Sequence, residues 1–289
     1  MALELGHERK FQICYESELR RVKDLRVVAR GIADGWRSSL KLLVSVVDAH
    51  EALEAVEGGA HIVDVKNPPE GALGANFPWV INEVKRSVSP VEVSATIGDL
   101  PNRPGTAALA ALGATTAGAD YVKAGLLGPR TCVEATLLMK AVCKAVKECN
   151  PTTRVIAAAF ADYEDVGSLN PNDLPSVASA SGTDGILVDI ATKHDRRLFD
   201  YMEEEDLATL ARKSHDLGFS VAFAGLLDIE DVARCYRLGA DIFGVRKSVC
   251  EGRDRVRGSV LKERVRALSD AVSSVAVGSN ILRTTPTIS

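Results

Sequence analysis

The chain has 289 residues, with 46% hydrophobic residues, 26% charged residues and a formal charge of -4. These values are those of an ordinary globular protein, and the slightly acidic balance argues against nucleic acid or a membrane surface as a partner. Because no apolar run approaches the ~18 residues that span a bilayer and the N-terminus lacks a secretory signal, we expect a cytoplasmic protein.

Residues 1–40 do not follow the pattern of the rest of the chain. Their apolar residues recur at loosely helical spacing among Glu, Arg and Lys side chains, which predicts a helical N-terminal extension. We expect this extension to pack on the outside of the main domain or on a neighbouring subunit. Together with the Ala-rich helices that follow, it is compatible with a homo-oligomer, although the sequence specifies no interface.

From residue 41 onward, short apolar runs alternate with Ala-rich helical stretches, which is typical of a parallel sheet with crossover helices. Eight strands are predicted, and eight strands close a TIM (β/α)8 barrel, which we place at residues 41–275 before a polar C-terminal tail at 276–289. The expected strands are 42–46, 62–65, 91–96, 121–124, 155–159, 186–188, 220–224 and 242–245. The expected helices are 49–56, 78–87, 106–117, 133–147, 174–181, 207–217, 229–238 and 261–275.

An open doubly wound sheet shows the same alternation and is the rival architecture. Such sheets often carry a Gly-rich phosphate loop directly after the first strand, but residues 45–49 read SVVDA, so a barrel is favoured. Gly-Ala-Asp or Gly-Thr-Asp also precedes three of the strands, at 118–120, 182–184 and 239–241. This repeat fits a helix end followed by a tight return turn.

An acid and an amine stand two residues apart at the end of the second predicted strand. On a strand this spacing points Asp64 and Lys66 to the same face. The Pro- and Gly-rich residues 68–74 then break regular structure. The pair therefore lies where a strand gives way to a loop, which is where a barrel holds its catalytic residues.

Charged residues at other strand ends are expected to meet this pair. Lys123 ends the fourth strand, and Asp189 follows the sixth with Lys193 four residues later. Burial and a neighbouring ammonium group both lower the pKa of a lysine, and a neutral amine attacks carbonyl groups, so these lysines indicate a Schiff-base site. The alternative is that they form structural ion pairs, Lys66 with Asp64 and Lys193 with Asp189.

Glycines at the ends of the seventh and eighth strands indicate phosphate binding. Gly225 and Gly244 leave backbone uncovered where barrels commonly hold a phosphate, and Arg246 and residues 252–255 add positive charge. The alternative is that these are turn glycines and solvated arginines. Since no His or Cys spacing indicates a metal site, no metal is expected.

Four segments of the chain resemble one enzyme family. They read DVKNPPEGALGANFPWV at 64–80, SATIGD at 94–99, GADYVK at 118–123 and GVR at 244–246. By these motifs the sequence is similar to the (5-formylfuran-3-yl)methyl phosphate synthases, which make the furan ring of methanofuran. The similarity covers roughly residues 42–268, so the N-terminal extension and the Thr-rich tail fall outside it.

The resemblance implies a reaction and a role for each charged residue. Two molecules of glyceraldehyde 3-phosphate would condense without a cofactor, losing phosphate and water, to give a furan aldehyde phosphate. Lys66 matches the family's Schiff-base lysine, and Lys123 matches the lysine that accepts a proton. Asp64, Asp189 and Lys193 match the other charged positions of the family's active site.

Two other functions fit the residues themselves. A class I aldolase would use Lys66 or Lys123 on another sugar phosphate and would make no furan. A non-catalytic phosphate-binding barrel would act only as a scaffold, with its lysines held in ion pairs.

Overall fold

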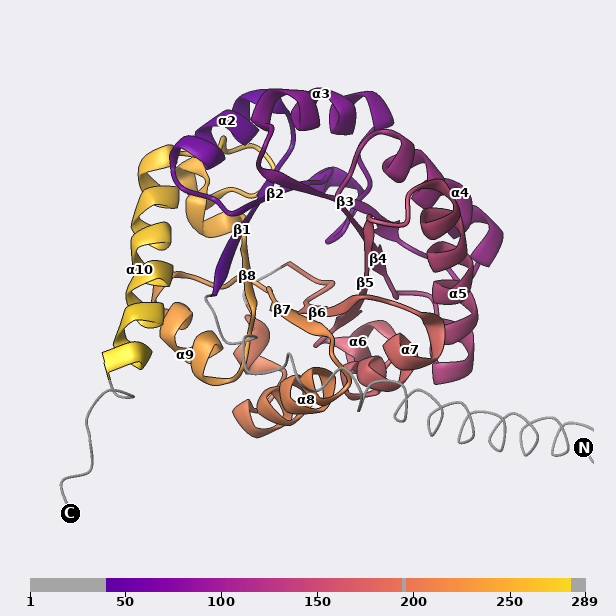
Figure 1. The fold of residues 1–289 in the computed structure, drawn as a ribbon. Coiled ribbons are helices and arrows are strands. Elements are labelled where there is room, and N and C mark those ends of the chain that lie inside the picture. The colour runs from indigo at the N-terminus through magenta and orange to yellow at the C-terminus, as the bar shows by residue number, and fades with distance from the viewer. Residues whose placement is uncertain (1–39, 194–195, 282–289) are drawn as a thin grey trace, which may run out of the picture. The chain divides into compact units, whose positions relative to one another are not determined.

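The structure, a computed structural model of the chain, describes residues 40–193 and 196–281 (Figure 1). Eight parallel strands pair in chain order, and β8 pairs with β1, so the sheet is a closed barrel. The TIM (β/α)8 barrel expected from the sequence is confirmed. The strands are β1 (Lys41–Val46), β2 (Ile62–Val65), β3 (Glu92–Asp99), β4 (Tyr121–Gly125), β5 (Arg154–Phe160), β6 (Gly185–Asp189), β7 (Ser220–Phe223) and β8 (Ile242–Val245).

Helices between the strands surround the barrel, as the ring of coiled ribbons in Figure 1 shows. They are α2 (Ala49–Glu57), α3 (Pro78–Val88), α4 (Pro104–Thr116), α5 (Cys132–Cys149), α6 (Tyr163–Val166), α7 (Leu174–Ser181), α8 (Glu204–Asp216), α9 (Val232–Arg237) and α10 (Lys262–Ile281). Short α6 was not predicted, and α10 runs beyond the expected end at Val275 into the predicted tail. Except for Leu40, the predicted N-terminal extension lies outside the described residues, and so do residues 282–289 of the tail.

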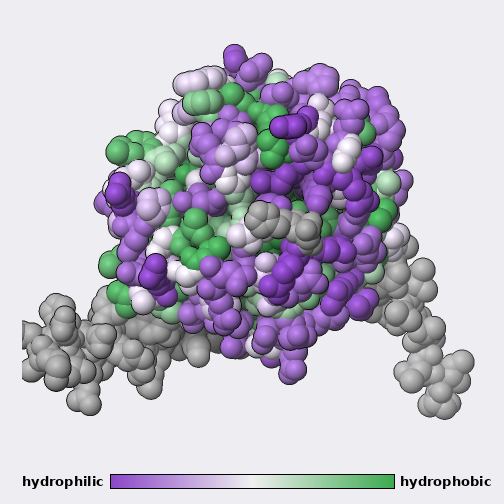
Figure 2. All heavy atoms as spheres, turned by 180° about the vertical axis from the view of Figure 1, so that it is seen from behind, coloured by the Kyte–Doolittle hydropathy of each residue, from purple (hydrophilic) through white to green (hydrophobic). Residues whose placement is uncertain are grey.

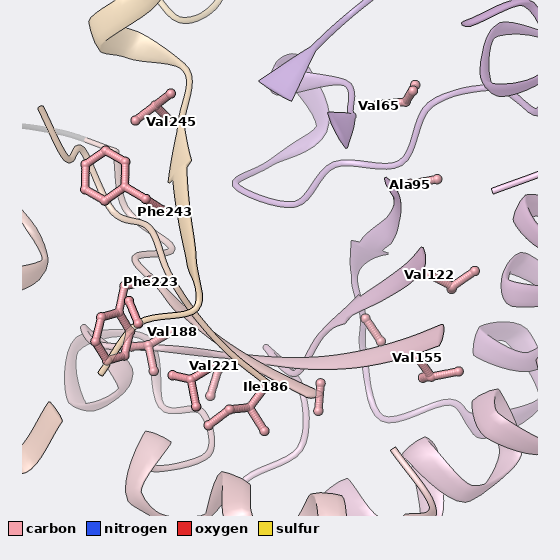
Figure 3. Packing of buried hydrophobic residues seen from close by; sticks show 14 of the residues in the cluster. Val65, Ala95, Val122, Val155, Ile186, Val188, Val221, Phe223, Phe243 and Val245 are labelled. Carbon is pink, nitrogen blue, oxygen red and sulfur yellow. The ribbon is translucent and has the colours of Figure 1, made fainter. Parts of the chain in front are cut away.

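Side chains that alternate between the two faces of each strand form two separate buried layers. Val65 of β2 and Val122 of β4 point away from the barrel axis toward the helices (Figure 3), where they join a large apolar cluster. Ile62 of β2 and Tyr121 of β4 belong to a second cluster, in the barrel interior. Because side chains alternate between the two faces of a strand, Asp64 and Lys123 face inward with this second cluster.

The Gly-Ala-Asp and Gly-Thr-Asp turns fasten neighbouring strands at the amino ends of the barrel. In each turn the Asp carboxylate accepts a hydrogen bond from the backbone N-H at the start of the preceding strand or close to it. The pairs are Asp120 with Val93 at 2.7 Å, Asp184 with Val155 at 2.7 Å, and Asp241 with Val221 at 2.8 Å. The repeat is therefore a structural device at the end opposite the polar strand ends.

Apolar side chains of the described residues are gathered mainly in the two buried clusters. On the face that Figure 2 shows, hydrophilic side chains cover most of the surface, and hydrophobic ones form small separate groups. Within residues 40–193 and 196–281, no helix has the length and apolar character needed to cross a membrane.

Candidate active site

The carboxylate of Asp64 holds two lysines in place. It is fully buried, with Lys123 Nζ at 2.6 Å from Oδ1, Lys66 Nζ at 3.7 Å from Oδ2, and a hydrogen bond of 2.9 Å donated by Ser45 Oγ. Burial raises the pKa of Asp64, but the ammonium groups of Lys123 and Lys66 outweigh this, so the pKa lies below its usual value. Lys123 of β4 and Lys66, directly after β2, thus meet at the two oxygens of one carboxylate.

Both lysines are almost completely buried, which is unusual for an ammonium group. Lys123 is 4% exposed and Lys66 is 7% exposed. Burial lowers the pKa of Lys123, an effect that the charge of Asp64 partly opposes and that of Lys66 reinforces. Lys66 Nζ also donates a hydrogen bond to the Ala72 carbonyl at 3.2 Å, in the loop that follows β2.

A second acid and amine pair stands at the end of β6. Asp189 forms an ion pair with Lys193, and its Oδ1 accepts the Ile190 N-H at 2.8 Å. Burial lowers the pKa of Lys193 to about 8, with Asp189 opposing the shift and the ammonium group of Lys66 adding to it. Burial raises the pKa of Asp189, but the ammonium groups of Lys193 and then Lys66 outweigh this, so the pKa lies below its usual value.

One pocket inside the barrel brings the predicted charged residues together. Asp64, Lys66, Lys123, Asp189 and Lys193 all line it. The sequence placed these five residues on one rim, and in the structure they lie together at this pocket. Within the part of the chain that the structure describes, no group of three or more His, Cys, Asp or Glu side chains could hold a metal ion.

The residues predicted to bind phosphate line the same pocket, but they differ in whether they are free to contact a ligand. Gly225, with a φ of 113°, and Gly244 contribute backbone without side chains after β7 and within β8. Arg246 is occupied: its guanidinium donates hydrogen bonds to Glu51 at 2.8 Å and 3.3 Å, to the Ser45 carbonyl and to the Arg255 carbonyl. Arg246 thus fastens the end of β8 to β1 and α2.

Two further residues of this region were not assigned from the sequence. Arg255 lines the pocket, and its Nη2 donates a hydrogen bond of 3.1 Å to the Gly71 carbonyl. The sequence had indicated it only as part of the segment 252–255, which reads GRDR. Glu51, the partner of Arg246, stands three residues after the helix-capping Asp48. This spacing marks the start of a helix, and it gives no sign of the pairing with Arg246.

A closed (β/α)8 barrel with buried lysines and carboxylates at the carboxyl ends of its strands defines the class of protein as a barrel enzyme. Residues 42–269 match the family described as 4-HFC-P synthase, and the chain belongs to this family. Its curated relatives include proteins named (5-formylfuran-3-yl)methyl phosphate synthase. The one from Methanopyrus kandleri is 50% identical over 81% of this chain and 99% of its own length. The one from Methanosarcina mazei is 48% identical over 74% and 92%.

Solved structures with the same fold are more distant in sequence. 3-Hexulose-6-phosphate synthase from Salmonella typhimurium has a TM-score of 0.59 at 18% identity, covering 82% of this chain and all of its own. KGPDC from Streptococcus mutans has a TM-score of 0.58 at 14% identity, covering 82% of this chain and 99% of its own. At this level of identity the likeness concerns the fold.

Proposed function

We propose that the chain condenses two molecules of glyceraldehyde 3-phosphate into (5-formylfuran-3-yl)methyl phosphate. The observation that carries this proposal is the pair of buried lysines, Lys66 and Lys123, on one carboxylate in a family whose relatives are named for that product. Atom balance requires one phosphate and two waters to leave. Every step is an addition, an elimination or a proton transfer, so no oxidant or reductant takes part.

Lys66 is the proposed nucleophile. Its amine adds to the carbonyl carbon of one triose phosphate, and loss of water gives an iminium ion. The positive nitrogen then accepts the electron pair released when the neighbouring C-H loses its proton. Lys66 suits this role because its Nζ lies in the pocket, fixed by the Ala72 carbonyl on one side and Asp64 on another.

Lys123 is the proposed proton acceptor. Burial lowers its pKa, so its neutral form is accessible nearer to neutral pH than that of a surface lysine. After Lys123 takes a proton, the carboxylate of Asp64 at 2.6 Å stabilises the resulting ammonium group. The Asp189 and Lys193 pair is proposed to transfer protons during the loss of phosphate and water.

The retained phosphate is proposed to bind at Gly225 and Gly244, where the backbone carries no side chain. Arg255 is the added cation at this end of the pocket, because the guanidinium of Arg246 is already bound to Glu51. Arg246 is therefore proposed to hold the ends of β8 and β1 in place beside this phosphate site. The sequence had predicted that it binds the phosphate itself.

Reduction with borohydride in the presence of glyceraldehyde 3-phosphate tests the nucleophile. Wild-type protein should gain the mass of a reduced triose phosphate adduct, and Lys66→Ala should gain none. Lys123→Ala should keep part of this adduct and lose turnover, since it removes the base and not the nucleophile. An adduct that persists in Lys66→Ala but disappears in Lys123→Ala or Lys193→Ala would show that the nucleophile is misassigned.

The product separates the proposal from its alternatives. A furan aldehyde absorbs in the ultraviolet, whereas an aldolase acting on another sugar phosphate would yield a carbohydrate without this absorbance. A scaffold would give neither product nor adduct with the wild-type protein. Incubation with glyceraldehyde 3-phosphate and identification of the product by its spectrum and mass therefore decides among the three.

A further inference from the structure

The loop after β2 connects Lys66 to a carboxylate on the next strand. Lys66 Nζ donates to the Ala72 carbonyl at 3.2 Å. The N-H of the same Ala72 donates to Asp99 Oδ2 at 2.8 Å, and the N-H of Leu73 donates to Asp99 Oδ1 at 3.1 Å. The oxygens of Asp99 thus hold the N-H groups on either side of the Ala72 carbonyl, which accepts the hydrogen bond from Lys66.

The backbone of β3 is distorted so that Asp99 can reach this loop. Thr96 pairs with Lys123 of β4, but Asp99 pairs with Gly125, so β3 holds one residue more than β4 over this interval. Gly98, with a φ of 111°, lies within the irregular stretch. An extra residue of this kind redirects the side chain that follows it, and here it directs the carboxylate of Asp99 toward residues 72 and 73.

Two glycines leave room for this carboxylate. A Cβ added to Gly71 would overlap Asp99 Oδ2, and one added to Gly125 would lie 2.9 Å from Oδ1. Gly71 also has a φ of 144°, which a residue with a side chain rarely adopts. The contact between loop and carboxylate therefore depends on specific residues in three elements: β3, β4 and the loop after β2.

We propose that Asp99 is a positioning residue that sets the direction of the Lys66 amine through the Ala72 carbonyl. An amine attacks a carbonyl carbon along its lone pair, so the direction of its N-H bonds decides where it reacts. With one N-H directed at Ala72 and Asp64 close by, the lone pair is left to face the pocket. This inference rests on the proposed role of Lys66 as the nucleophile.

The decisive variant is Asp99→Asn, which keeps the size of the side chain but leaves one acceptor oxygen for two N-H donors. We expect the rate of borohydride trapping at Lys66 and kcat to fall roughly 10- to 100-fold, with KM changed much less. The hydrogen bonds of Asp99 go to Ala72 and Leu73, and not to the glycines proposed to bind the phosphate. Gly71→Ala should act in the same direction, since its Cβ displaces the carboxylate.

Asp184→Asn is the matched control. Its carboxylate also accepts a backbone N-H, from Val155 at 2.7 Å, but at the opposite end of the barrel. Thermal unfolding of each variant is recorded, and Asp184→Asn should lower the midpoint while keeping the wild-type trapping rate. If Asp99→Asn does not fold, Gly71→Ala supplies the comparison.

A folded Asp99→Asn or Gly71→Ala variant that traps at the wild-type rate would overturn the inference, and so would an equal loss of trapping in Asp184→Asn. These results leave the proposed function intact, because the wild type still forms its adduct. Absence of any adduct on the wild type refutes the proposed function, and this inference falls with it.

Discussion

The charged side chains of the pocket determine one another's protonation. Three lysines share the pocket with two aspartates, so opposite charges do not fully offset the cost of burying the amines. Lys123 and Lys193 respond with a lowered pKa, caused first by burial, while Asp64 and Asp189 stay ionised because the ammonium groups lie beside them. The site therefore combines accessible neutral amines with fixed negative charges.

The lowered pKa of Lys193 predicts how stability depends on pH. Below about pH 8 both the folded and the unfolded chain hold this proton, and between about 8 and 10.5 only the unfolded chain does. The free energy of unfolding should therefore rise with pH in this window, by up to on the order of 3 kcal/mol from this one group. Urea unfolding from pH 7 to 10 should show a shallower rise for Lys193→Met than for the wild type.

Lys193→Met also affects Asp189, but this does not obscure the comparison of its unfolding with that of the wild type. Removal of the ammonium group raises the pKa of the Asp189 carboxyl, but a carboxylate titrates mainly on the acid side of neutrality. Parallel stability curves for the wild type and Lys193→Met above pH 8 would contradict the lowered pKa of Lys193.

At the scale of elements, the strands could be predicted and the details of their ends could not. Alternating apolar runs and Gly-x-Asp turns are local signals, and they located all eight strands to within a few residues. The irregular stretch of β3 before Asp99 was missed because nothing local distinguishes an extra residue in a strand from the start of a loop. The expected strand therefore ended at Thr96, three residues before Asp99.

The candidate site, too, has residues whose position the sequence predicted and others whose contacts it did not. Lys66, Lys123 and Asp189 were placed on one rim because the carboxyl ends of parallel strands meet there. Arg246 was expected to face a phosphate, but it pairs with Glu51, which lies 195 positions away in the sequence. A contact between residues so far apart depends on the closure of the barrel, which pairs β8 with β1 and so brings Arg246 to α2. No local pattern encodes this.

The Gly-x-Asp turns should contribute to stability without contributing to catalysis. Asp241 accepts a hydrogen bond from the Val221 N-H at 2.8 Å and pairs with His215 Nε2 at 2.9 Å, and neither Asp241 nor His215 lines the pocket. We expect Asp241→Ala to lower the free energy of unfolding by about 1 to 3 kcal/mol and to leave kcat unchanged at temperatures where the variant stays folded. Urea unfolding measures the predicted loss of stability, and turnover assays measure kcat. A loss of kcat without a loss of stability would contradict this structural role.

At the scale of the whole molecule, the charge of the pocket is opposite to that of the chain. The chain carries a formal charge of -4. The pocket is lined by more cations than anions: Lys66, Lys123, Lys193, Arg246, Lys247 and Arg255 against Asp64 and Asp189. A cleft with low-dielectric walls concentrates the field of such groups, so a doubly charged phosphate is attracted to the pocket in spite of the negative charge of the chain.

This arrangement predicts a strong dependence of substrate capture on salt. Raising sodium chloride from about 0.05 M to about 0.5 M shortens the Debye length from about 14 Å to about 4 Å, so kcat/KM for glyceraldehyde 3-phosphate should fall several-fold, mainly through KM. Borohydride trapping with glyceraldehyde, which carries no phosphate, serves as the control and should hardly respond to salt. Arg255→Met should weaken the salt dependence with the phosphorylated substrate, because it removes a pocket cation that pairs with no carboxylate among the described residues. Equal salt dependence with both aldehydes would show that the field of the pocket does not guide the phosphate.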